Sequence, residues 1–188
     1  MQTPANTTNI SDLDCPLCVD LDGTLLRVDS AYKLFTRSVI RNPLLLFPIL
    51  VIWATSGMAK VKQHLAQRVS YNVADFPIHE SFYRFLKQEK AKNRTLILVS
   101  GTDKSIAQAC AKYFGIFSDV MASDGKINLV GKNKASHLVN KFGAHKFDYA
   151  GNERKDIYVW QVSRKAYLVG SRFKPSRTTI KFEQVFDA

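Results

Sequence analysis

The sequence predicts an α/β fold with a doubly wound parallel sheet, and two observations support that prediction. Short apolar runs recur along the chain, and segments with helical spacing separate most of them. Strands that alternate with helices favour parallel pairing, because each helix carries the chain back across one face of the sheet. The runs interpreted as strands are 16–21, 95–100, 117–122, 146–150 and 166–169.

Helices are expected between these runs. Apolar residues recur with helical spacing in four segments: 80–92, 103–113, 134–142 and 156–163. Gly115 and Gly143 are placed to end the second and third of these helices. The alternation therefore covers most of the chain after residue 80.

The segment 30–75 interrupts this rhythm, because it lies between the first two strands and reads as mostly helical. We interpret it as an inserted helical cap. The expected organisation is a loose leader at 1–15, a core made of 16–29 and 76–188, and the cap at 30–75.

One stretch of the expected cap, 44–54, is almost entirely apolar, and no charged residue occurs between Asn42 and Ala59. These 18 residues are at the lower edge of the length that a membrane span requires. Three interpretations stay open: a hairpin buried in the cap, an interfacial segment that touches lipid, and a true span.

The composition limits the partners and the compartment. A net charge of +11 over 188 residues favours anionic partners such as phosphorylated substrates, nucleic acid or an acidic lipid surface. We expect no nucleic-acid partner, because no recognition motif that combines aromatic and basic residues occurs. Three cysteines argue against a disulfide framework, and no signal peptide is expected, so we predict a cytoplasmic location.

The chemistry is concentrated where the first apolar run ends. Asp20 and Asp22 follow that run, and Gly23 lets the chain curl so that both carboxylates reach one site. One carboxylate can attack phosphorus while the other carries a proton to and from the leaving oxygen. A turn built from Asp and Gly is the alternative interpretation. Attack on an anionic ester also requires charge neutralisation, which Mg²⁺ can supply.

The segment Val19-Asp-Leu-Asp-Gly-Thr-Leu25 resembles the first motif of the haloacid dehalogenase (HAD) superfamily. The resemblance implies a Rossmann-like core, Mg²⁺ as cofactor, and phosphatase activity through an aspartyl-phosphate. It implies Asp20 as nucleophile, Asp22 as general acid/base, and the Asp20 carboxylate with the Asp22 main-chain carbonyl as metal ligands.

Later motifs follow in the order of that superfamily. Ser100 ends an apolar run and, with the backbone N–H of Gly101, is expected to hold phosphoryl oxygens. Lys134 is the candidate for the basic residue, with Lys132 as competitor. In the fourth motif Asp156 matches the second metal-site acid, whereas Asn152 stands where the first is usual and carries no charge.

The position of the cap, directly after the first motif, resembles that in phosphoserine phosphatases. Asp29 stands at the spacing where those enzymes carry a carboxylate that contacts the substrate. The alternative interpretation of Asp29 is that it caps a helix. Ala122-Ser-Asp-Gly125 and Phe147-Asp-Tyr-Ala-Gly-Asn152 resemble the phosphatase-like domain fused to UbiA-type membrane prenyltransferases. That resemblance suggests a lipid-linked or sugar phosphate substrate, a membrane surface or prenyltransferase domain as partner, and a peripheral position at the inner membrane face. A soluble small-molecule phosphatase and a non-catalytic regulatory domain are the alternatives.

Overall fold

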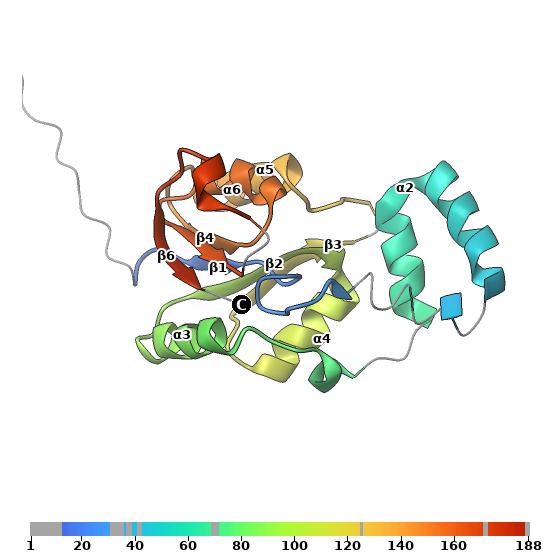
Figure 1. Cartoon of the computed structure of the whole chain (residues 1–188), viewed down its shortest axis with the longest axis horizontal. Helices are drawn as coiled ribbons and strands as arrows, with labels where there is room; N and C mark the ends of the chain where they lie inside the picture. Colours follow the sequence, from blue (N-terminus) through green and yellow to red (C-terminus); the bar gives the residue numbers. More distant parts are fainter. Residues whose placement is uncertain are drawn as a thin grey trace, which may run out of the picture.

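The computed structural model describes residues 13–30, 36, 39–40, 43–68, 72–124, 126–170 and 173–186. In these residues six strands form a single parallel sheet with the order β3-β2-β1-β4-β5-β6 (Figure 1). The strands are β1 (Leu17–Val19), β2 (Leu96–Asp103), β3 (Asp119–Ser123), β4 (Asp148–Gly151), β5 (Ala166–Val169) and β6 (Phe182–Phe186). The predicted doubly wound α/β fold is confirmed.

Helices cover both faces of this sheet, as Figure 1 shows. On one face lie α3 (Glu80–Ala91) and α4 (Lys104–Phe114), and on the other lie α5 (Lys132–Phe142) and α6 (Ile157–Trp160). Side chains of β1 and β2 alternate between two apolar cores: Leu96 and Leu98 pack toward α3 and α4, whereas Ile97 and Val99 pack toward α5 and α6. Burial on both faces explains why the central strands read as continuous apolar runs.

Local signals placed the helix ends well. Asp103 caps α4 by accepting a hydrogen bond from the Ser105 backbone N–H at 2.9 Å, and Gly115 ends the helix with φ of 67°. The helix predicted at 134–142 begins two residues earlier, at Lys132. Lys134 therefore lies in the first turn of α5.

The sequence did not reveal β6. Its residues Glu183, Gln184 and Val185 are exposed, and only Phe186 is buried, so the strand lacks the apolar run that marked the others. It pairs with β5 at the edge of the sheet. An edge strand needs few buried side chains, which is why its pattern is weak.

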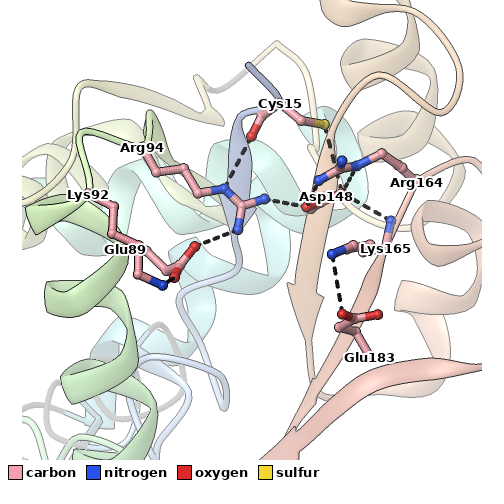
Figure 2. Close-up of polar contacts among 8 residues, drawn as sticks. All are labelled: Cys15, Glu89, Lys92, Arg94, Asp148, Arg164, Lys165 and Glu183. Carbon is pink, nitrogen blue, oxygen red and sulfur yellow. Dashed lines mark hydrogen bonds and ion pairs between the residues drawn. The ribbon is translucent and has the colours of Figure 1, made fainter. Parts of the chain in front are cut away.

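A buried ion network ties together the amino ends of several strands (Figure 2). Asp148, the first residue of β4, accepts hydrogen bonds from the guanidinium groups of Arg94 and Arg164 and from the Lys165 backbone N–H. Arg94 also binds Glu89 at 2.8 Å. The side chains of Arg94 and Asp148 are both 0% exposed, so this network holds the end of the sheet opposite to the strand carboxyl ends.

The segment expected to form the cap contains α2 (Leu46–Arg68), which stands to one side of the sheet in Figure 1. Gly57, with φ of 75° and ψ of 178°, breaks α2 into two helical halves. The halves pack through Ile49, Ile52 and Val61. Many apolar side chains of the stretch 44–54 are nevertheless exposed, so the prediction that this hairpin is buried is wrong.

The other two interpretations of the stretch 44–54 are a membrane span and a segment that touches lipid. Across the described residues, no helix combines the length and the apolar character that crossing a bilayer requires. Contact with a lipid surface stays a prediction. The division into leader, core and cap also stays a prediction, and residues 1–12 of the expected leader lie outside the described part of the chain.

Candidate functional site

The predicted site residues gather at the carboxyl ends of the strands. Asp20 directly follows β1 and Asn152 directly follows β4, and these strands are parallel neighbours. Their carboxyl ends meet at one edge, where a cavity of about 110 Å³ opens. Its lining residues are Asp20, Asp22, Asp29, Gly101, Thr102, Val130, Gly131, Lys134, Asn152, Glu153, Lys155 and Asp156.

The loop after β1 turns tightly enough to bring Asp22 back to this edge. Backbone N–H groups of Leu25 and Leu26 donate to the carbonyls of Asp20 and Leu21. Gly23 adopts φ of +77°, and a Cβ atom there would lie 2.1 Å from Nδ2 of Asn152. Only glycine satisfies both conditions, so this position sets the distance between the loop and the end of β4.

Asp20 is buried and held by two donors. Lys134 Nζ donates to Asp20 Oδ1 at 2.6 Å, and Thr24 Oγ1 donates to Asp20 Oδ2 at 3.3 Å. Burial raises the pKa of Asp20 to about 7, although the ammonium group of Lys134 opposes the shift. Burial therefore favours the neutral form of the Asp20 carboxyl group, and Lys134 favours its charged form.

Lys134 also reaches the fourth predicted motif, through a tyrosine. Its Nζ donates to the Tyr149 hydroxyl at 2.9 Å, and that hydroxyl donates to Asp156 Oδ1 at 2.7 Å. Asp156 Oδ2 is fixed by the backbone N–H groups of Asn152 and Glu153, each at 3.0 Å. Burial alone would lower the pKa of Lys134, but the Asp20 and Asp156 carboxylates outweigh it and raise the pKa, so the ammonium stays charged.

Tyr149 escaped the sequence analysis because it lies within an apolar strand, where an aromatic residue reads as core. The structure gives it both roles: its ring is fully buried in a core cluster, and its hydroxyl joins Lys134 to Asp156. The competitor Lys132 is exposed and its Nζ lies over the Tyr158 ring, 5.3 Å from the centroid. Geometry therefore favours Lys134 as the basic residue of the site.

The remaining acidic candidates also reach the cavity. Asp22 lines it, and its Oδ1 accepts a hydrogen bond from the Ser30 backbone N–H at 2.8 Å. Asp29 lines it as well and is exposed, so it lies at the outer part of the site. This position suits a residue that contacts the body of a substrate better than one that contacts the reacting atoms.

Ser100 and Gly101 occupy different positions. Gly101 lines the cavity, but Ser100 is fully buried behind it, and its Oγ accepts a hydrogen bond from the Thr102 backbone N–H at 3.0 Å. Thr102 itself lines the cavity, with its hydroxyl 3.2 Å from the Ser30 Oγ. Of the residues Ser100 to Thr102, Gly101 and Thr102 therefore line the cavity, and the predicted Ser100 does not.

The oxygen donors in the cavity suit a hard divalent cation, although they carry little negative charge to bind it. In the described part of the chain, no three Asp, Glu, His or Cys side chains come together as metal ligands. The cavity instead offers the carboxylates of Asp20 and Asp156 and the neutral amide of Asn152. Oxygen donors of these kinds are those that Mg²⁺ prefers. The residues present therefore fit Mg²⁺ with one charge fewer than a set of three carboxylates.

Comparisons with known proteins agree with the fold. The sequence model of the haloacid dehalogenase-like hydrolases matches residues 17–158. The uncharacterized protein y4nM of Sinorhizobium fredii is 30% identical over 179 residues, which is 93% of this chain and 34% of that protein. The chain thus spans about a third of the length of this curated relative.

Several solved structures are similar. The HAD family hydrolase t0658 of Salmonella enterica serovar Typhi superposes with a TM-score of 0.65 at 12% identity, covering 91% of this chain and 66% of that one. Phosphoserine phosphatase in its apo form gives 0.59 at 12% identity over 92% and 93% of the two chains. Identities this low show a shared fold and leave the substrate open.

Proposed function

This chain belongs to the haloacid dehalogenase-like hydrolases, and on that basis we propose that it is a Mg²⁺-dependent phosphatase that acts through an aspartyl-phosphate. One observation carries the proposal. The ammonium of Lys134 lies 2.6 Å from the Asp20 carboxylate, in a cavity that Asp22 also lines. A buried nucleophile, a neighbouring carboxyl group for proton transfer and a fixed cation are what phosphoryl transfer requires.

The proposed reaction has two steps. An Asp20 carboxylate oxygen attacks phosphorus, the bond between phosphorus and the leaving oxygen breaks, and Asp22 donates a proton to that oxygen. Water then attacks phosphorus while Asp22 takes its proton, and the bond between phosphorus and the Asp20 oxygen breaks. Lys134 and the backbone at Gly101 and Thr102 contact the phosphoryl oxygens.

Asp20, Asp156, Asn152 and the main-chain carbonyl of Asp22 are the residues that would hold Mg²⁺. A bound Mg²⁺ would neutralise charge on the nucleophile and the phosphoryl group. The chain's own contribution is the placement of Lys134, which Tyr149 and Asp156 support from the other side.

The size of the cavity supports a substrate class rather than a single substrate. About 110 Å³ is small beside ordinary ligand pockets, so the cavity suits the phosphoryl group, and the rest of the substrate would lie outside near Asp29 and Lys155. We propose that the substrate is a phosphate monoester, either a lipid-linked phosphate or a sugar phosphate. A soluble phosphoamino acid is the alternative that a substrate panel would separate.

The test compares Mg²⁺-dependent hydrolysis of p-nitrophenyl phosphate by the wild-type chain, Asp20→Asn and Asp119→Asn. Asp20→Asn keeps the size of the side chain and removes the nucleophile, so we expect a loss of about a thousandfold or more. Asp119 lies at the amino end of β3, exposed and away from the cavity, so its variant should keep wild-type activity. Equal activity in the wild type and Asp20→Asn would refute the proposed nucleophile.

A second candidate function is a non-catalytic domain that binds phosphate esters, and Asn152 favours it. The neutral amide stands where the family usually has a carboxylate, which weakens the attraction for a metal ion. The two candidates differ in one outcome. If neither wild type nor variant hydrolyses the ester, but a beryllium fluoride complex binds only with both Mg²⁺ and Asp20, the binding function is the better description.

A further inference from the structure

The first half of α2 and the 3-10 turn that precedes it (Pro43–Leu45) present large apolar side chains to solvent. We call Leu44, Phe47, Leu50, Val51 and Trp53 the apolar face, and their exposed fractions run from 46% to 82%. Phe47, Leu50 and Val51 have the i, i+3, i+4 spacing that places side chains on one side of a helix, and Leu44 and Trp53 flank them. Exposed apolar side chains gathered in this way mark an interaction surface more often than single ones do.

Among the residues that the structure describes, the packing of α2 does not explain this apolar face. The two helical halves contact each other through Ile49 and Ile52 of the first half and Val61 of the second, and Ile49 and Ile52 are not part of the apolar face. In Figure 1 the first half of α2 lies away from the sheet, at the outer edge of the molecule. The apolar face is thus separate from both apolar cores and from the cavity at the strand ends.

The charge of the sequence segment that contains the apolar face indicates the partner. Residues 30–74 contain six Lys or Arg (Lys33, Arg37, Arg41, Lys60, Lys62 and Arg68) and no Asp or Glu. More than half of the chain's net charge of +11 therefore comes from under a quarter of its residues. A purely apolar partner would not require this bias, whereas an anionic bilayer surface attracts each of these charges.

We propose that the first half of α2 docks on an anionic lipid surface, with the apolar face in the interface. The helix breaks at Gly57, so the first half is 11 residues, Leu46 to Ser56, and roughly 16 Å long. A bilayer core is about 30 Å thick, so this half lies along the surface and does not cross it. Trp53 would take the interfacial position that tryptophan favours.

The test measures binding of the chain to vesicles, with no phosphate ester present, so its outcome is independent of the proposed hydrolysis. Vesicles of phosphatidylglycerol and phosphatidylcholine in equal parts should bind the chain in a flotation assay. Vesicles of phosphatidylcholine alone should bind it more weakly, and high salt should weaken binding to the anionic vesicles. No flotation with anionic vesicles at low salt would overturn the proposal.

Variants separate the apolar face from charge alone. Phe47→Glu and Leu50→Glu should each weaken vesicle binding about tenfold or more. Tyr113→Glu is the matched control, because Tyr113 is 57% exposed on α4, outside the apolar face, and it should bind as the wild type does. Equal losses in all three variants would mean that general charge, and not this face, holds the chain on the vesicle, and would overturn the proposal.

Fluorescence gives a direct readout of depth. The chain has two tryptophans, and Trp160 is 3% exposed whereas Trp53 is 56% exposed. Brominated lipid should therefore quench Trp53 on binding. Unquenched Trp53 in the presence of brominated vesicles would refute the lipid surface. If the wild-type chain instead forms a concentration-dependent dimer that Phe47→Glu abolishes, and binds no vesicles, the apolar face contacts a second copy of the chain.

Discussion

Asp148→Asn tests how the sheet is held at the end opposite to the cavity. Asp148 is the buried carboxylate that accepts hydrogen bonds from Arg94 and Arg164, so the substitution leaves two guanidinium groups without their shared anion (Figure 2). Removing one partner of a buried ion pair costs about 3–5 kcal/mol. Arg94 keeps Glu89, and the Arg164 side chain is 18% exposed and can reach water, so we expect the lower value, about 3 kcal/mol.

Urea denaturation measures this loss. With a slope of about 2 kcal/mol per molar urea for a domain of this size, the midpoint of unfolding should fall by about 1.5 M. The matched control is Asp119→Asn, because Asp119 also begins a strand and pairs with a lysine, Lys141. That pair is 49% and 41% exposed, so its loss should cost at most about 1 kcal/mol. Equal midpoint shifts in the two variants would refute the structural role given to Asp148.

Three further predictions concern the cavity. Tyr149→Phe removes the hydroxyl between Lys134 and Asp156; kcat should fall about tenfold with little change in KM, and a variant with wild-type kcat would show that Lys134 needs no such support. Asn152→Asp adds a carboxylate, so calorimetric titration with Mn²⁺ should show tighter binding than in the wild type, and unchanged affinity would place the cation elsewhere. Burial raises the Asp20 pKa from 3.8 to about 7, so between these pH values the metal-free folded chain holds a proton that the unfolded chain has released. The Asp20 contribution to the free energy of unfolding therefore falls as the pH rises from 3.8 to about 7. Urea denaturation in EDTA at several pH values should show this fall in the wild type, and Asp20→Asn should lack it.

The fold was accessible from the sequence where burial leaves a pattern. The interior strands β1, β2 and β5 lie between two layers of helices, so each is an apolar run that stands out from its surroundings. The α4 ends were set by local chemistry at Asp103 and Gly115, which acts within a few residues. The edge strand β6 has mostly exposed side chains, and only its pairing with β5 defines it.

The site was accessible where a residue type is unusual for its place. Carboxylates at the end of an apolar strand stood out at Asp20, and the structure brings Asp22, Lys134 and Asp156 to the same cavity. Tyr149 could not be found in this way, because its function depends on a hydroxyl at the far end of a core side chain. Such a contact arises from tertiary packing and has no local signal.

The central claim is that Asp20 is the nucleophile, and a trapping experiment tests it most directly. The wild-type chain, mixed with Mg²⁺ and a phosphate ester labelled with ³²P and quenched in acid, should retain label on the protein, and hydroxylamine should release it as expected for an acyl phosphate. Asp20→Asn should retain none, while the exposed control Asp119→Asn should retain as much as the wild type. Label that persists in Asp20→Asn, or hydrolysis by the wild type with no labelled protein at any time of quench, would contradict the account.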